Sequence, residues 1–283
     1  MKNLSPIIKP QELCALMLKN KVRLIDARVG VNIKEVFQKQ HIEGAILVDL
    51  EQNLSKITTH PADGGRHPLP NIHVFAQFLG TLGIGTNTHV VVYDDKNGAN
   101  AAARFWWMLK ALGHKKVQVL DGGFQAALPN AVPTSHILKK YRQKPPYPVS
   151  DWQLPLADLR EVERVAQNKD YVVIDVRDAE RYRGEKEPID LIAGHIPGAI
   201  NMPFSTNLDA QGLFLPKEML GKQYAPLFDN RTSDKIIVHC GSGVTACHTL
   251  LAMDYAGFEM PKLYVGSWGE WSRNDKEIGL GSK

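Results

Sequence analysis

The fold is decided by one stretch in the second half of the chain, which reads Ile236-Ile237-Val238-His239-Cys240-Gly241-Ser242-Gly243-Val244-Thr245-Ala246. It begins with a β-branched run of the kind found in strands that are buried on both faces of a parallel sheet. Two glycines then predict a tight turn, and residues 244–255 have helical character and end near Gly257. The stretch therefore predicts a strand, a loop and a helix of an α/β fold.

The same unit occurs earlier in the chain. Four segments match in the same order: 24–28 with 173–177, 41–46 with 195–200, 90–94 with 236–240, and 122–124 with 266–268. Ordered matches of this kind indicate a duplicated domain. Each copy alternates short β-branched runs with helical segments, so we expect two parallel sheets, each flanked by helices.

The predicted domains are residues 1–134 and 157–283, separated by a linker over residues 135–156. The linker contains Lys139-Lys140-Tyr141-Arg142-Gln143-Lys144-Pro145-Pro146-Tyr147-Pro148. Its prolines favour an extended, semi-rigid connection.

Composition excludes several classes of protein. The 283 residues include 34 Lys and Arg against 30 Asp and Glu, a net charge of +4 without the basic stripe that nucleic-acid binding requires. Three cysteines are too few for a disulfide framework, and no apolar run is long enough to span a membrane. The amino terminus resembles neither a signal peptide nor a transit peptide. We expect a cytoplasmic protein without a nucleic-acid or membrane partner.

Cys240 is the predicted nucleophile. Ligands of parallel sheets bind at the carboxyl ends of strands, where the next helix presents free N–H groups and partial positive charge. Gly241 and Gly243 allow successive amides, through Val244 and Thr245, to converge on one point and stabilise a thiolate. Cys14 and Cys247 are predicted to be packed thiols.

Other uses of this loop are less well supported. The pattern from Gly241 to Ala246 resembles a dinucleotide fingerprint, but the acidic residue expected at the end of the next strand is missing. A cysteine phosphatase would need an arginine where Ala246 stands. Metal binding by His239, Cys240, Cys247 and His248 is disfavoured because a strand-to-helix turn separates the pairs. We expect no metal and no cofactor.

The chain resembles the two-domain rhodanese-like sulfurtransferases, specifically the 3-mercaptopyruvate type. The residues that carry the resemblance are the loop 240–245 and the segments 65–70 and 194–199. It implies two tandem rhodanese-like domains, the first without a nucleophile because Asp94 occupies the position of Cys240. Thiosulfate-preferring members carry basic residues in this loop. Gly241 and Ser242 stand at those positions here, which favours 3-mercaptopyruvate, with thiosulfate as a poorer donor.

The resemblance also implies a mechanism. Cys240 attacks the donor sulfur, pyruvate leaves, and the resulting persulfide passes its outer sulfur to cyanide or to a thiol such as thioredoxin. Ser242 is predicted to relay a proton during this reaction. Thr245 is predicted either to relay a proton or to cap the helix. A thiosulfate sulfurtransferase and a non-enzymatic persulfide carrier remain as alternatives.

The substrate carboxylate requires a cation, and the family's substrate arginine aligns with Arg181. Arg177 and Arg183 are expected to form surface ion pairs. Animal members carry a further substrate arginine where Asp190 stands here, so Arg66 or His67 of the first copy is predicted to replace it if the cleft lies between the domains.

The resemblance also bears on Asn32 and on two histidines, His41 and His195. The first-domain aspartate of animal members falls near Asn32, which leaves that acidic relay incomplete. His41 and His195 are expected to be structural, because each precedes a predicted turn.

Overall fold

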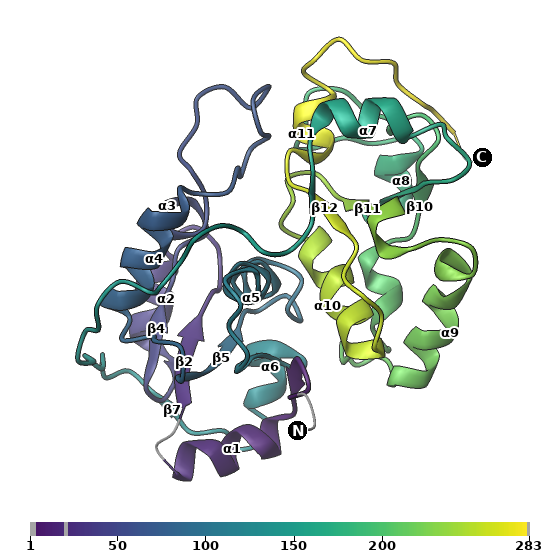
Figure 1. The fold of residues 1–283 in the computed structure, drawn as a ribbon. Coiled ribbons are helices and arrows are strands. Elements are labelled where there is room, and N and C mark those ends of the chain that lie inside the picture. The colour runs from purple at the N-terminus through teal and green to yellow at the C-terminus, as the bar shows by residue number, and fades with distance from the viewer. Residues whose placement is uncertain (1–3, 20–21, 282–283) are drawn as a thin grey trace. The chain divides into compact units, whose positions relative to one another are not determined.

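The computed structural model describes residues 4–19 and 22–281. The chain divides into two compact units, shown in Figure 1: residues 1–56, 69–153 and 210–213 form the first, and residues 57–68, 154–209 and 214–283 form the second. These limits differ from the boundaries expected from the sequence. Residues 57–68 belong with the second unit although they come from the first half of the chain.

The first unit is built on a five-stranded parallel sheet in the order β1-β6-β5-β2-β4. The strands are β1 (Ile7–Ile8), β2 (Val22–Asp26), β4 (Ala45–Leu47), β5 (His89–Tyr93) and β6 (Val117–Leu120). Its helices are α1 (Pro10–Leu18), α2 (Ile33–Lys39), α3 (Leu50–Asn53), α4 (Ile72–Thr81), α5 (Ala101–Ala111) and α6 (Gly123–Ala127). A separate antiparallel pair joins β3 (His41–Ile42) to β7 (Thr134–Ser135).

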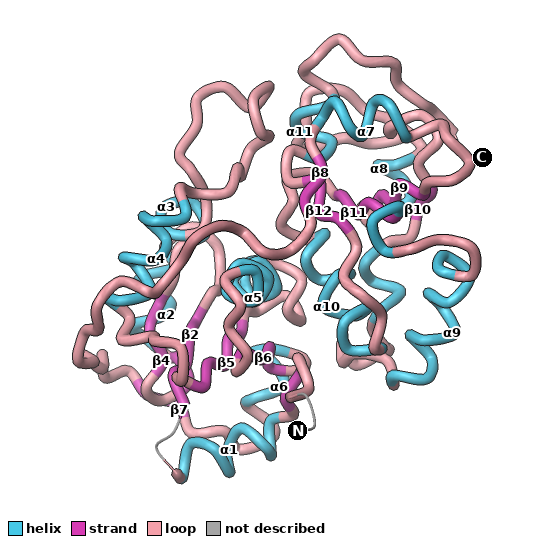
Figure 2. The backbone as a smooth tube through the Cα atoms, in the orientation of Figure 1, coloured by secondary structure: helices cyan, strands magenta, loops and turns pink. Residues whose placement is uncertain are grey.

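The second unit repeats this plan with the strand order β10-β9-β11-β12-β8, again parallel (Figure 2). The strands are β8 (Leu156–Ala157), β9 (Val172–Asp175), β10 (Ile200–Asn201), β11 (Ile236–His239) and β12 (Lys262–Tyr264). The helices are α7 (Leu159–Val165), α8 (Ala179–Tyr182), α9 (Lys217–Phe228), α10 (Ala246–Ala256) and α11 (Ser267–Trp271), with short 3-10 turns η1 (Phe204–Asn207) and η2 (Ser233–Lys235). The predicted α/β fold with two parallel sheets is confirmed.

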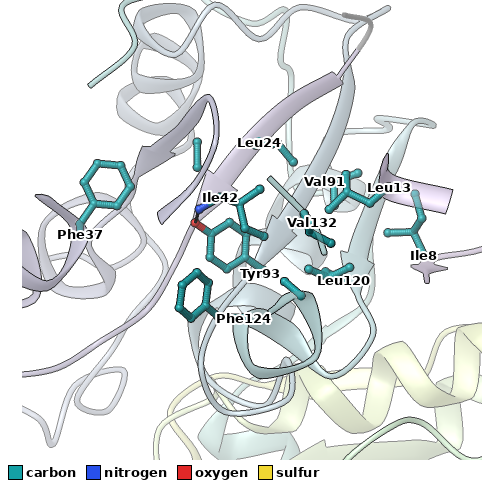
Figure 3. Close-up of a cluster of buried hydrophobic side chains, with 12 residues drawn as sticks. Ile8, Leu13, Leu24, Phe37, Ile42, Val91, Tyr93, Leu120, Phe124 and Val132 are labelled. Atoms are coloured by element: carbon teal, nitrogen blue, oxygen red, sulfur yellow. Dashed lines mark hydrogen bonds between the residues drawn. The ribbon is translucent and has the colours of Figure 1, made fainter. Parts of the chain in front are cut away.

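Each sheet is held by a core of apolar side chains from strands and helices. In the first unit, Tyr93 and Val91 of β5 pack in one cluster with Leu13 of α1 and Phe124 of α6 (Figure 3). In the second unit, Val173, Ile237 and Tyr264 from three strands pack with Trp268 of α11. Burial of these side chains away from water is the main force that fixes the helices on the sheets.

The duplicated sequence produces duplicated contacts. Arg28 forms a buried ion pair with Asp26 at 2.7 Å, and Arg177 forms the equivalent pair with Asp175 at 2.6 Å. The prediction that Arg177 forms a surface ion pair is therefore wrong, because its side chain is only 1% exposed. The guanidinium lies over the Trp268 ring, which excludes water from the pair.

The paired histidines also have equivalent positions. The Nδ1 atom of His41 lies 2.7 Å from the Phe37 carbonyl, and that of His195 lies 2.8 Å from the Tyr182 carbonyl. Each imidazole stacks on the ring of the residue whose carbonyl it contacts. These contacts tie the histidines to the helices that precede them, which is a structural role.

Much of the predicted linker is ordered against the first unit. The N–H groups of Lys144, Tyr147 and Gln153 donate to the carbonyls of Gly80, Ala76 and Ala111. This backbone pairing explains why the first unit extends to residue 153. Among the described residues, no helix combines the length and apolar character needed to cross a membrane.

Candidate active site

Cys240 lies at the carboxyl end of β11, the central strand of the second sheet. The residue is 3% exposed, and its Sγ accepts a hydrogen bond of 3.5 Å from the N–H of Ser242. Helix α10 begins a few residues later at Ala246, with Thr245 at its N-cap. The sulfur therefore lies against a main-chain donor of the strand-to-helix turn.

The turn is held in place by residues 266–269. The Cys240 N–H donates to the Ser267 hydroxyl at 3.2 Å, and the Trp268 N–H donates to the Cys240 carbonyl at 3.0 Å. The Gly269 N–H donates to the Gly241 carbonyl at 2.9 Å. The sequence pointed to this segment only as a repeat match. The first unit has the equivalent bond, from the Phe124 N–H to the Asp94 carbonyl at 2.8 Å, so the match of 122–124 with 266–268 was the signal for the role of this segment.

Two arginines lie beside the residue that follows Cys240. A methyl group built on Gly241 would lie 3.0 Å from Nη2 of Arg66 and 3.5 Å from Nη2 of Arg181. Glycine keeps this approach open, because a methyl group at position 241 would crowd the Arg66 guanidinium and the Asp190 carboxylate. The structure thus brings Arg181 to the loop together with Arg66, the predicted substitute for the second arginine.

Arg66 reaches this position because its segment belongs to the second unit. The Gly64 N–H donates to Oε1 of Glu270 at 2.8 Å, and Nδ2 of Asn274 donates to the Ala62 carbonyl at 2.8 Å. His67 is buried in the same segment, and its role in binding stays a prediction.

The arginines are joined by two carboxylates: Asp190, which stands where the family's further substrate arginine aligns, and Glu187, which the sequence did not place in the site. Asp190 accepts hydrogen bonds from Arg66 at 2.9 Å and from Arg181 at 3.1 Å, and it lies 3.5 Å from Arg273. Glu187 accepts hydrogen bonds from Arg181 at 2.6 Å and from Arg177 at 3.2 Å. Arg183 remains outside this network in an exposed pair with Glu185, as expected.

Two buried carboxylates that pair with arginines near the Cys240 loop, Asp175 and Glu187, have pKa values below their ordinary values. Burial is the largest single effect on the pKa of Asp175 and would raise it, but the charge of Arg177 and the hydrogen bonds that Arg177 donates together help to hold that pKa below its ordinary value. Burial also opposes ionisation of Glu187, but the hydrogen bond and charge of Arg181 and the N–H groups of Ile189 and Asp190 together lower its pKa. Both carboxylates therefore remain charged and hold their arginines in place.

His239 precedes Cys240 and is fully buried. Burial lowers its pKa even though Asp175 lies 3.9 Å from Nε2. The ring is therefore neutral at pH 7. Because a carbonyl can only accept, Nδ1 carries the proton that is shared with the Cys240 carbonyl at 3.1 Å.

The first unit shows how the equivalent turn holds an anion. Asp94 follows β5 as Cys240 follows β11, and its carboxylate accepts hydrogen bonds of 2.8 to 3.1 Å from the N–H groups of Lys96, Gly98, Asn100 and Ala102. Burial raises the pKa of this carboxyl, and the four donors oppose that rise. The turn after this strand therefore collects main-chain donors around one side chain.

The other predicted residues lie in or beside the loop. Gly243 has a left-handed φ of +70°, and Val244 is buried. Thr245 makes no capping hydrogen bond with its side chain among the described residues. Cys247 is buried within α10 and its Sγ contacts the Gly243 carbonyl at 3.4 Å, as expected of a packed thiol. The described part of the chain holds no group of three or more His, Cys, Asp or Glu that could bind a metal.

Comparisons of the sequence and of the structure with known proteins all lead to rhodanese-like domains and sulfurtransferases. The rhodanese-like domain family matches residues 9–128 and 158–274. A probable 3-mercaptopyruvate sulfurtransferase of Pseudomonas aeruginosa is 38% identical over 270 residues, which are 94% of each chain. A thiosulfate sulfurtransferase of Gallus gallus is 36% identical over 84% of this chain and 80% of its own. The crystal structure of a 3-mercaptopyruvate sulfotransferase from Escherichia coli superposes with a TM-score of 0.78 at 29% identity, covering 94% of this chain and 99% of that one.

Proposed function

The chain belongs to the rhodanese-like family, and from that premise we propose that it is a sulfurtransferase that takes sulfur from 3-mercaptopyruvate through a persulfide on Cys240. The family assignment confirms the resemblance carried by the loop 240–245 and the repeated motifs. The proposal rests on one arrangement. The Cys240 thiol at the end of β11 accepts a hydrogen bond from a main-chain N–H, and Arg66 and Arg181 lie beside Gly241.

The arginines serve the donor's carboxylate. A guanidinium binds a carboxylate through two parallel hydrogen bonds, which fixes orientation as well as position. Arg66 and Arg181 both approach Gly241, the neighbour of the nucleophile. A carboxylate bound there places the short carbon chain of the donor near Sγ of Cys240.

The first half of the reaction balances without an external reagent. The Cys240 thiolate attacks the donor sulfur, the carbon–sulfur bond breaks, and its electron pair leaves on carbon as the enolate of pyruvate. The proton of the donor thiol ends on that carbon, giving pyruvate and a persulfide anion. We assign the relay of this proton to the Ser242 hydroxyl. The N–H of Ser242 supports the proposal that the persulfide anion is stabilised by the main chain.

In the second half, an acceptor takes the outer sulfur and regenerates the thiolate. Cyanide leaves as thiocyanate, and a thiol such as that of reduced thioredoxin leaves as a persulfide. Two substrates that react in turn at one cysteine produce ping-pong kinetics.

The test is the intact mass of the protein after incubation with 3-mercaptopyruvate. The wild type is expected to gain one sulfur atom, and Cys240→Ser none. Cys247→Ser is the matched control, because that thiol is buried in α10, and it should gain sulfur like the wild type. Equal gain by Cys240→Ser and the wild type would refute the proposal.

A thiosulfate sulfurtransferase is the second candidate, supported by the similarity to the chicken enzyme. Steady-state assays with cyanide separate the two, because a kcat/KM that favours thiosulfate would select this alternative. A persulfide carrier without catalytic activity would load Cys240 but show no turnover with either donor.

A further inference from the structure

We propose that Asp190 sets the charge of the donor that this site accepts, by neutralising one of the arginine charges beside the nucleophile; this inference rests on the proposed function. Its carboxylate lies against the loop: a methyl group built on Gly241 would be 3.1 Å from Oδ2, and one on Gly269 would be 3.2 Å from Oδ1. The side chain is completely buried, so water does not screen it from the site.

Asp190 contacts arginines from three separate segments. Arg66 comes from the segment 57–68, Arg181 from α8, and Arg273 follows α11. Arg66 donates to Asp190 through Nε, which leaves its Nη2 directed at Gly241. Asp190 is thus a positioning residue, because it orients the cations that would hold the donor's carboxylate.

The ion-pair network has a defined net charge. Among the described residues, four arginines and three carboxylates are joined by ion pairs, which leaves one positive charge; they are Arg66, Arg177, Arg181, Arg273, Asp175, Glu187 and Asp190. This charge complements 3-mercaptopyruvate, which carries one carboxylate. Thiosulfate is a dianion and is better matched by two positive charges. Removal of the Asp190 charge would create that second positive charge.

Asp190→Asn is the direct test. The ratio of kcat/KM for thiosulfate to kcat/KM for 3-mercaptopyruvate should rise at least about tenfold, because the lost charge lies within hydrogen-bond reach of the binding arginines. Asp190→Glu keeps the charge and should keep a ratio close to that of the wild type. Added salt should reduce the rise, because mobile ions screen charge.

Two further variants test the electrostatic cause. Arg273→Gln removes a positive charge from the same cluster and should lower the ratio, so the sign of the effect is tested even if Asp190→Asn fails to fold. Glu185→Gln removes a carboxylate whose pair with Arg183 is exposed and outside the network, and it should change the ratio less than about twofold.

The outcomes distinguish this inference from the proposed function. If neither donor adds sulfur to wild-type Cys240, the proposed function fails. If the wild type is loaded but the ratio is unchanged in Asp190→Asn, or rises in Arg273→Gln, Asp190 does not set donor charge and this inference alone is refuted.

Discussion

Gly243→Ala perturbs the turn that presents Cys240. The glycine has a φ of +70°, and an added methyl group would lie 2.5 Å from the carbonyl oxygen and 2.8 Å from Cα of Val265. These are backbone atoms of the neighbouring chain segment, which cannot rotate away. Gly257, at the end of α10, is the matched control, because its φ is +98° but nothing lies within 4 Å of an added methyl group.

The two variants share one cost and differ in another. A left-handed conformation costs a non-glycine residue about 1–2 kcal/mol, so Gly257→Ala should lose that amount of unfolding free energy. Gly243→Ala should lose a further ~1–3 kcal/mol from the collision with Val265. Urea denaturation of both variants and the wild type measures this difference.

The collision with Val265 should also lower the rate at which Cys240 is loaded with sulfur. Val265 leads into residues 266–269, whose hydrogen bonds hold Cys240 and Gly241. Displacement of this segment moves the Ser242 N–H from Sγ, so the rate of sulfur loading by folded Gly243→Ala should fall at least about tenfold, as for loss of a preorganised anion donor. Gly257→Ala should load at the wild-type rate. The reasoning is refuted if the two variants have equal stability and equal loading rates.

Three other predictions follow from the contacts described. Arg181→Lys keeps the positive charge but loses the bidentate hydrogen bonding of the guanidinium. In steady-state assays kcat/KM for 3-mercaptopyruvate should fall about 10- to 100-fold, while saturating donor should still load Cys240. An unchanged kcat/KM would remove Arg181 from the binding site. Asp94→Asn leaves some main-chain donors of the first unit unpaired, so urea denaturation should show a loss of about 1–3 kcal/mol of unfolding free energy. Sulfur loading of Cys240 should not slow. Slower loading would contradict a purely structural role for Asp94. Burial lowers the pKa of His239 below its ordinary 6.5, so the unfolded chain binds the proton first and stability falls as the pH drops below 6.5. His239→Gln should lose less stability than the wild type between pH 7.5 and pH 5 in urea titrations, and an equal loss would refute this assignment.

The sequence by itself determined the duplicated α/β plan and the position of Cys240, the proposed nucleophile, at the end of a strand. Both depend on local patterns: β-branched runs that become parallel strands, and a glycine-rich turn between a strand and a helix. Cys240 follows its strand directly in the chain, so its place at the end of β11 could be deduced before any long-range contact was known.

Only the tertiary structure decided which charges surround that nucleophile. Arg66 and Asp190 are 124 residues apart, and no periodicity or spacing predicts that they meet. The segment that carries Arg66 was expected in the first domain, yet it pairs with Glu270 and Asn274 in the second unit. Hydrophobic periodicity reports which face of an element is buried, whereas an ion pair depends on how distant segments pack. The sequence therefore pointed to the proposed nucleophile, and only folding assembled the charged side chains that lie around it.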